Sequence, residues 1–219
     1  MISQAVQDYL KSIYKLQQEN PDDSVSTTDI AKDLDVSGAS VTGMIKRLDT
    51  MGMVDYSSYK GVKLTEKGEK VALEIIRFHR LIETYLKEML GFPLDKIHDE
   101  ACRLEHHISE EFIERINKLL GEPKFDPHGH PIPSKDGTII EYEEKPLSEI
   151  EPGGEYYISR LSDTDQKLLA YLELMNLMPN IKIKVIDKAP FKGPITISYN
   201  GSEKIIGNEV ASNIFVKIQ

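Results

Sequence analysis

The spacing of apolar residues changes along this chain, and that change constrains the fold more than any other feature. Up to about residue 120, apolar side chains recur every three or four positions, which predicts helices. Between Gly121 and Gly137 stand four prolines and three glycines, which predict an ordered loop or a linker. The following segments alternate with a period of two, which indicates strands. We therefore expect a mainly α-helical protein with a small β domain.

The first 70 residues show a pattern typical of nucleic-acid-binding modules. A first helix is expected over 3–18, and two short helices over 27–34 and 39–51 are joined by a tight turn that contains Gly38. Two short helices around such a turn are the helix-turn-helix pattern. Residues 53–64 predict two short strands around a polar turn, in the position of a wing. The segment is therefore predicted to be a winged helix-turn-helix.

Three more helices are expected before the proline-rich stretch. Thr65 is placed to cap a long helix that runs to about Leu90, followed by helices over 94–107 and 109–120. These helices carry more apolar surface than so few elements bury alone. We therefore expect part of this surface to form the seam of a homodimer.

The last third predicts a small β-barrel of SH3-like size. Strands are expected over 155–159, 181–186, 195–199 and 214–217, with one helix near 165–174. The predicted domains are a winged helix-turn-helix over 1–70, a helical dimerisation domain over 71–137, and the SH3-like domain over 138–219.

Charge and cysteine content limit the class of protein and the cellular compartment that we expect for this chain. The chain has 27 basic and 36 acidic residues and a net charge of −9, which excludes a strongly basic nucleic-acid binder but not a local basic surface. Its single cysteine allows no intrachain disulfide. Because the chain also begins without a basic leader and contains no long apolar run, we expect a cytoplasmic protein that does not associate with membranes.

One short segment concentrates metal-ligating side chains. His98, Cys102, Glu105 and His106 have the spacing i, i+4, i+7, i+8, which in a helix covers an arc of roughly 100°. Two imidazoles, a thiol and a carboxylate on one face suit a transition metal. A second pair with helical spacing, His79 and Glu83, lies upstream.

Two other interpretations of this segment are open: a helix face that binds nothing, and an enzyme. Cys102 has a histidine four residues away on each side, but the sequence shows no loop that could form an oxyanion hole. A metallohydrolase would need an open coordination position and a substrate cleft, and the sequence shows neither. We therefore assign no catalytic residue.

The predicted third helix has the side chains of a DNA-reading helix. Residues 36–48 contain no acidic side chain, although the chain is acidic overall. Small hydroxyls and methyl groups suit base edges, and cations suit phosphates. The candidate DNA-binding residues are Ser37, Ala39, Ser40, Thr42, Gly43, Lys46 and Arg47, with Lys60 in the wing. The alternative is a solvated helix in a winged-helix module that binds protein.

The chain resembles the diphtheria-toxin-repressor family of metal-dependent transcriptional regulators, which includes iron-dependent repressors and manganese transport regulators. The specific signal is the block His98-Asp99-Glu100-Ala101-Cys102-Arg103-Leu104-Glu105-His106. The Val36-Ser37-Gly38 turn, the run His79-Arg80-Leu81 and the proline-rich segment 126–133 extend the resemblance over nearly the whole chain.

The resemblance implies two metal sites in each chain. Cys102, Glu105 and His106 would form the activating site and be completed by Asp8 on the first helix. His79, Glu83 and His98 would form an ancillary site, with Asp163 and Gln166 as candidate ligands from the SH3-like domain. His128 and His130 are assigned to loop structure rather than to a metal site.

The pairing of Asp8 with Cys102 departs from the family pattern. Iron-type members usually pair a methionine with the cysteine, and manganese-type members pair an aspartate with a glutamate. Aspartate suits Mn²⁺, whereas a thiolate suits softer metals. Lys11 stands where manganese-type members tend to carry a carboxylate. On balance we expect Mn²⁺ rather than Fe²⁺.

The resulting hypothesis is a metal-activated, homodimeric repressor that binds palindromic promoter DNA and controls metal-ion homeostasis. The alternative is a metal-dependent hydrolase or a metal-buffering protein with an incidental winged helix.

Overall fold

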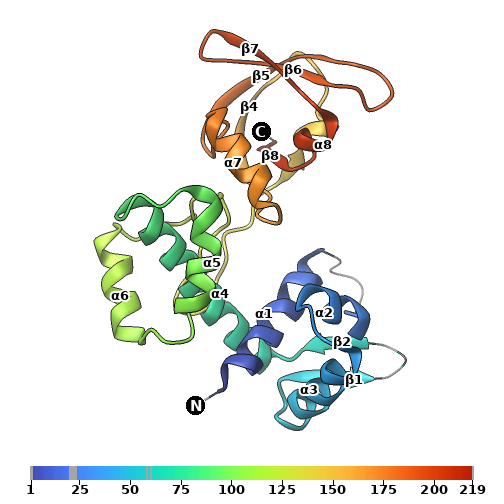
Figure 1. The fold of residues 1–219 in the computed structure, drawn as a ribbon, viewed down its shortest axis with the longest axis vertical. Coiled ribbons are helices and arrows are strands. Elements are labelled where there is room, and N and C mark those ends of the chain that lie inside the picture. Colours follow the sequence, from blue (N-terminus) through green and yellow to red (C-terminus); the bar gives the residue numbers. More distant parts are fainter. Residues whose placement is uncertain (1, 20–23, 58, 60, 219) are drawn as a thin grey trace. The chain divides into compact units, whose positions relative to one another are not determined.

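The computed structural model describes residues 2–19, 24–57, 59 and 61–218, and the chain forms two compact units (Figure 1). The first unit comprises Met1–Phe78 and Pro133–Thr138, and the second comprises His79–Ile132 and Ile139–Gln219. Among the described residues, no helix has the length and apolar character needed to cross a membrane.

The first unit confirms the predicted winged helix-turn-helix. Its elements are α1 (Gln4–Glu19), α2 (Thr27–Asp33), α3 (Gly38–Thr50), the antiparallel strands β1 (Val54–Ser57) and β2 (Gly61–Leu64), and the start of α4 (Glu66–Glu88). Serine side chains begin both helices of the motif. The Ser26 hydroxyl accepts from the Asp29 N–H, and the Ser37 hydroxyl accepts from the Ser40 N–H. These caps satisfy amide groups that have no partner within the helix.

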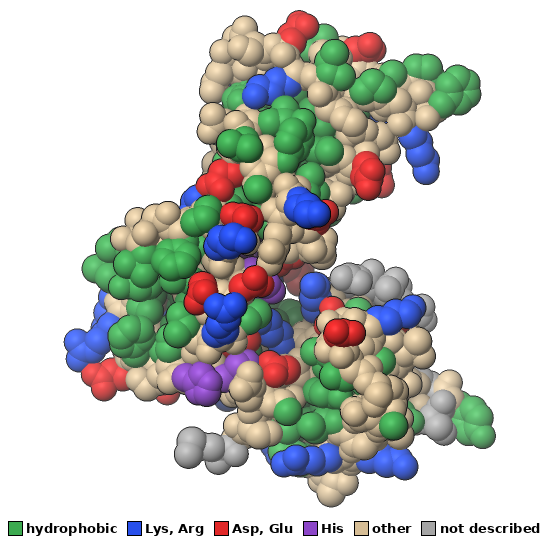
Figure 2. Space-filling view, viewed as in Figure 1, with side chains coloured by type: hydrophobic (Ala, Val, Ile, Leu, Met, Phe, Trp, Pro, Cys, Tyr) green, Lys and Arg blue, Asp and Glu red, His purple; other side chains and the backbone are tan. Residues whose placement is uncertain are grey.

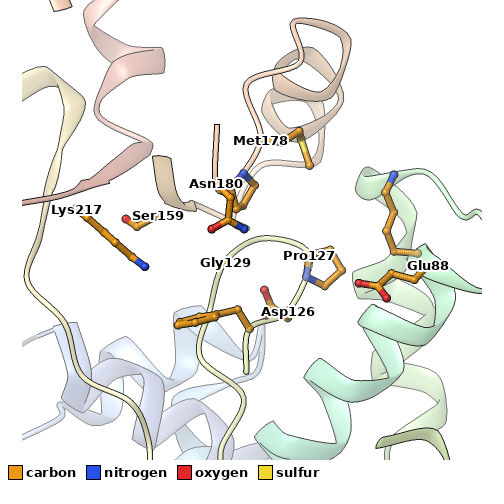
Figure 3. Close-up of a pocket in the computed structure, with 11 residues that line it drawn as sticks. Glu88, Asp126, Pro127, Gly129, Ser159, Met178, Asn180 and Lys217 are labelled. Atoms are coloured by element: carbon orange, nitrogen blue, oxygen red, sulfur yellow. The ribbon is translucent and has the colours of Figure 1, made fainter. Parts of the chain in front are cut away.

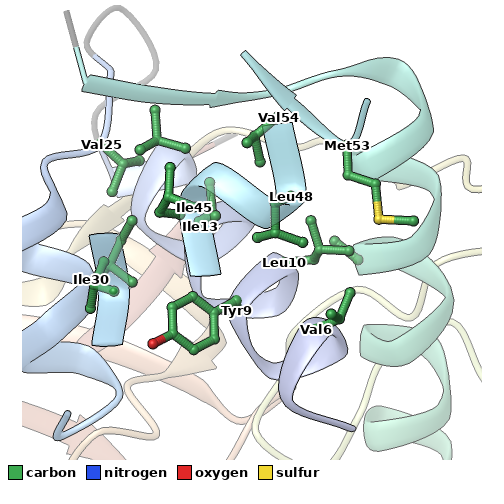
Figure 4. Packing of buried hydrophobic residues seen from close by; sticks show 13 residues of the cluster. Val6, Tyr9, Leu10, Ile13, Val25, Ile30, Ile45, Leu48, Met53 and Val54 are labelled. Atoms are coloured by element: carbon green, nitrogen blue, oxygen red, sulfur yellow. The ribbon is translucent and has the colours of Figure 1, made fainter. Parts of the chain in front are cut away.

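One hydrophobic cluster holds these elements together (Figure 4). Side chains from α1, α2, α3 and the hairpin converge in it, including Val6, Leu10, Ile13, Ile30, Val41, Ile45, Leu48, Val54 and Val62. Gly68 on α4 lets that helix approach the hairpin closely, because a Cβ there would lie 1.9 Å from the Met53 carbonyl oxygen. The cluster fixes α3 and leaves its opposite face exposed.

The helices of the second unit are the rest of α4, α5 (Leu94–Leu104) and α6 (Glu110–Leu119). Helix α5 is shorter than the predicted range 94–107. The helix ends at Leu104 with Glu105 as its C-cap, and the His107 N–H bonds to the Leu104 carbonyl in the turn that follows. Ser109 then caps α6 through the Phe112 N–H. The chain needs residues 105–108 to change direction between the two helices, so His106 lies in a turn and not on the α5 face.

The β part of the second unit is an antiparallel sheet in the order β3-β8-β4-β5-β6-β7. The strands are β3 (Glu144–Pro146), β4 (Glu155–Leu161), β5 (Lys182–Lys188), β6 (Ile195–Tyr199), β7 (Ser202–Ile206) and β8 (Ile214–Lys217). A 3₁₀ turn (Leu147–Glu149), α7 (Gln166–Leu174) and α8 (Asn208–Ala211) accompany the sheet. The sequence predicted four of these strands and α7, and missed the edge strands β3 and β7 and the short α8.

Candidate metal centre and DNA-reading helix

Helices α4 and α5 bring four predicted metal ligands together. His79 and Glu83 lie one turn apart on α4, and His98 and Cys102 lie one turn apart on α5. His79 Nε2 is 3.0 Å from Glu83 Oε1 and 3.2 Å from His98 Nδ1. Cys102 Sγ is 3.6 Å from His98 Nε2 and 4.0 Å from His79 Nδ1. We call these four residues, together with Glu105, the donor cluster.

Glu105 joins the cluster from the end of α5. Its Oε2 lies 2.5 Å from His79 Nδ1, and its Oε1 lies 3.3 Å from His106 Nε2. Only 2% of Glu105 is exposed. His106 therefore stays beside the cluster even though it lies outside the helix.

The electrostatics of the cluster favour charged forms. Burial by itself would raise the pKa of the Glu83 carboxyl, but the neighbouring imidazoles, above all His79, hold that pKa well below its usual value. The hydrogen bond to Cys102, followed by that to Glu83, raises the pKa of His98 to about 9. Without a metal, the neighbouring Cys102 and Glu83 therefore favour the protonated form of His98.

His128 is a residue near the cluster that the sequence analysis assigned to loop structure. Its side chain is fully buried, and within the described structure neither ring nitrogen has a hydrogen-bond partner. Its Nδ1 lies 3.8 Å from Glu83 Oε2 and 4.0 Å from Asp126 Oδ1. Both separations are too long for a hydrogen bond, and ions held between such atoms are a common reason for them.

A rigid loop holds His128 in this position. Asp126 Oδ1 accepts from the backbone N–H groups of His128 and His130, each at 2.9 Å. Gly129 has φ +94°, and a Cβ there would lie 2.1 Å from the Ser159 carbonyl oxygen. The sequence signal that could have found this site is the pair of histidines directly after Asp126-Pro127.

The donors present fit a divalent transition metal. A buried imidazole without a hydrogen-bond partner beside a buried carboxylate is a costly arrangement unless a cation satisfies both groups. His79, His98 and Cys102 offer three ligand atoms within 4.8 Å of one another, and Asp126, His128 and His130 offer three more. Imidazole and carboxylate ligands suit Mn²⁺, Fe²⁺ and Zn²⁺.

A cavity of about 290 Å³ lies against the outer side of the same loop (Figure 3). Asp126, Pro127 and Gly129 line it together with Lys217 and Asn180. The Asp126 carboxylate is already engaged by two backbone N–H groups, so the cavity adds no metal ligand.

Two predicted ligands, Asp163 and Gln166, do not belong to these groups of close donor atoms. Asp163 is half-buried in the segment between β4 and α7, outside the groups of close donor atoms among the described residues. Gln166 is exposed and donates from Nε2 to Asp99 Oδ1 at 3.0 Å. Asp8 is half-buried on α1 in the first unit.

Helix α3 presents the predicted DNA-reading residues to solvent. Those exposed are Ser37, Ala39, Ser40, Gly43, Lys46 and Arg47, and Thr42 is half-buried with its hydroxyl donating to the Gly38 carbonyl. Figure 2 shows basic side chains along the edge of the first unit where Figure 1 draws α3. Lys60 lies outside the described residues.

Three known domain families match successive parts of the chain. Residues 1–62 match the iron-dependent repressor N-terminal DNA-binding domain, and residues 65–134 match the iron-dependent repressor metal-binding and dimerisation domain. Residues 145–218 match the FeoA domain. A manganese-dependent transcriptional repressor in complex with manganese superposes with a TM-score of 0.89 at 35% identity, covering 96% of this chain and 98% of that one. The chain belongs to the diphtheria-toxin-repressor family.

Two further relatives of the chain are a diphtheria toxin repressor and an iron-dependent repressor. The chain is 28% identical to the diphtheria toxin repressor of Corynebacterium glutamicum, over 95% of this chain and 94% of that protein. It is 29% identical to the iron-dependent repressor IdeR of Mycobacterium tuberculosis, over 95% of each chain. These relatives are transcriptional repressors and not enzymes, so the repressor hypothesis is confirmed over the hydrolase.

Proposed function

We propose that the chain is a Mn²⁺-activated repressor that binds palindromic promoter DNA as a homodimer and controls metal-ion homeostasis in the cytoplasm. The observation that carries the proposal is the buried His128 beside Glu83, next to the donors of α4 and α5. This arrangement supports metal binding in a chain whose family members are metal-dependent repressors.

The ancillary site, called the second site below, would be held by His79, Glu83 and His98, with His128 as a further ligand. Its support is the set of short distances around Glu83, together with the lack of hydrogen-bond partners at the His128 ring. Asp163 and Gln166 remain candidates from the family resemblance.

The activating site would be held by Cys102, Glu105 and His106, with Asp8 from α1. The burial of Glu105 and its contact with His106 support the first part of this set. Asp8 enters from the family resemblance alone.

The preference for Mn²⁺ rests on the ligands and on the relatives. Asp8 and Glu105 are hard oxygen donors, which favour Mn²⁺, and Cys102 alone favours a softer ion. The manganese-dependent repressor is 35% identical to this chain, compared with 29% for the iron-dependent repressor IdeR of Mycobacterium tuberculosis.

Metal binding would act on DNA binding through the equilibrium between conformations. A bound ion supplies a positive charge that links donors from α1 and from the end of α5. Asp8 and Glu105 would thereby restrict the chain to arrangements in which the two α3 helices of a dimer fit successive major grooves, about 34–36 Å apart. A 100-fold increase in DNA affinity requires ~2.7 kcal/mol, and DNA must strengthen metal binding by the same factor.

The dimer seam is proposed on α6. Phe112 and Leu119 are 50% and 59% exposed, and Figure 2 shows hydrophobic side chains gathered over this helix. The match of residues 65–134 to a metal-binding and dimerisation domain supports this proposal, because α6 falls within that range.

The proposal is tested with His106→Ala and Glu105→Ala, with His107→Ala as the matched control. His107 is adjacent in sequence and exposed, whereas the side chain of His106 is only 3% exposed. Both test variants should lose Mn²⁺-dependent DNA binding while their circular dichroism spectra stay unchanged, and His107→Ala should behave like the wild type. An unchanged metal response in both test variants would remove these residues from the activating site.

A further inference from the structure

Helix α5 carries His98 and Cys102, yet it lacks a cap of its own. Pro93 occupies its N-cap position and provides no side-chain acceptor for the first amides of the helix. The helix has 11 residues, a length at which an isolated helix is marginal in water. The first turn of α5 therefore depends on groups from elsewhere.

Glu173 of α7 supplies the missing cap. Its Oε2 accepts a hydrogen bond from the Leu94 N–H at 3.0 Å, and its Oε1 pairs with the Lys87 ammonium group of α4. Burial by itself would raise the pKa of Glu173, but the bonds from Lys87 and from the Leu94 amide lower it. A carboxylate at this position also interacts favourably with the positive end of the helix dipole.

A second contact ties α7 to α5. At the start of α7, Gln166 donates to Asp99, which follows His98 directly. The contacts of Gln166 and Glu173 therefore span the part of α5 that contains His98. Leu94, Ile97 and Ala101 of α5 are buried, whereas His98 and Cys102 are half-buried.

We propose that Glu173 is a positioning residue through which the β part of the chain holds the metal-binding helix α5 in its ligand geometry. Fraying of an uncapped helix begins at its first turn, and His98 lies one turn after Leu94. Any part of the helix that is frayed without metal must fold when the metal binds, and this lowers affinity. The inference rests on the proposed metal site and gives the SH3-like domain a role besides the supply of candidate metal ligands.

The test uses full-length protein with Glu173→Ala, Glu173→Gln and the control Glu155→Ala. Glu155 forms an exposed pair with Lys182 on the same sheet, away from α5. Glutamine loses the charge but keeps an oxygen that can accept from the Leu94 N–H. Each variant is compared with the wild type in three measurements: hydrogen exchange of residues 94–104 in the metal-free protein, Mn²⁺ affinity by calorimetry, and the thermal midpoint of unfolding.

Glu173→Ala should speed exchange of the first α5 amides and lower Mn²⁺ affinity by up to about fivefold, the factor that corresponds to a cap of ~1 kcal/mol. Glu173→Gln should restore most of both properties, and Glu155→Ala should change neither. A general loss of stability would not produce this rescue.

Two results would overturn the inference. The first is a Glu173→Ala variant whose hydrogen exchange and Mn²⁺ affinity match those of the Glu155→Ala control. The second is a Glu173→Gln variant as impaired as Glu173→Ala, which would assign the effect to the ion pair with Lys87. A wild-type protein that binds no Mn²⁺, Fe²⁺ or Zn²⁺ would instead contradict the proposed metal site. The hydrogen-exchange comparison would still show whether Glu173 caps α5.

Discussion

Two neighbouring polar residues, Glu83 of the donor cluster and His128 of the proline-rich loop, are buried. Glu83 is 1% exposed and His128 is fully buried. Burying a polar group costs free energy unless it has a partner, and the His128 ring has none among the described residues. Selection for stability alone would favour apolar side chains at these positions. A bound cation would give both side chains a partner and so account for their presence at buried positions.

At the residue scale, His98 should make the metal-free protein sensitive to alkaline pH. Its pKa is raised from 6.5 to about 9, so the folded state holds this proton more tightly than the unfolded state does. The resulting stabilisation is fully present below pH 6.5 and is lost as pH rises through 9. The thermal midpoint of chelator-treated protein should fall over this range, and His98→Gln should flatten the fall. An identical pH profile in the variant would refute the assignment.

His128→Ala should remove one metal from the second site. Because His128 is the only ligand proposed from the proline-rich loop, its loss should weaken that site by at least about tenfold. Metal content after dialysis against limiting Mn²⁺ should fall in His128→Ala but not in the control His107→Ala. Equal metal content in the two variants would return His128 to a purely structural role.

The sequence predicted all five members of the donor cluster as candidate ligands, because helical spacing places such residues on one face or close to it. His128 could not be predicted in the same way. Its neighbour Glu83 is distant in sequence, and its burial depends on the Asp126 loop, which no local periodicity reveals.

At the scale of helices and strands, capping residues and hydrophobic spacing made α1 to α4 predictable to within about two residues. The strand β7 was missed because Ser202-Glu203-Lys204 has little apolar alternation, and β3 because it has three residues and ends in proline. Both lie at the edges of the sheet, where one side of the strand has no partner strand and weak patterns are tolerated.

Two helical glycines should respond in opposite ways to alanine. Gly68 is buried against the Met53 carbonyl, so Gly68→Ala should lower stability by ~1–3 kcal/mol through steric overlap. Gly43 is exposed on α3 with no atom near the Cβ position, so Gly43→Ala should raise stability by ~0.5–1 kcal/mol. Urea unfolding of both variants measures this difference. A stabilised Gly68→Ala would show that α4 does not approach the hairpin as closely as described.

At the scale of the whole molecule, the chain combines a DNA-binding unit with a unit that carries the donor cluster and an exposed apolar helix. The donor cluster and α3 therefore lie in different units, and a metal-dependent repressor requires metal binding and DNA binding to be coupled. Dimer formation belongs to the same scale, because one chain presents only one α3.

Phe112→Glu combined with Leu119→Glu should produce a monomer. The two charges would be buried in the proposed seam, whereas Leu174→Glu, at a side chain that is 84% exposed on α7, should leave the dimer intact. Sedimentation velocity with Mn²⁺ measures the difference. The monomer should keep its bound metal and lose at least about tenfold in affinity for a palindrome, since only one half-site is bound. A double variant that remains dimeric would move the seam away from α6.

The most direct test of the central claim is fluorescence-anisotropy binding to promoter DNA of a metal-uptake gene, with Mn²⁺, anaerobic Fe²⁺ and Zn²⁺ titrated against a chelator control. We predict sequence-specific binding that requires metal, is reversed by chelator and is strongest with Mn²⁺. Sequence-specific binding of equal strength with metal and with chelator would contradict the claim that the donor cluster controls DNA binding.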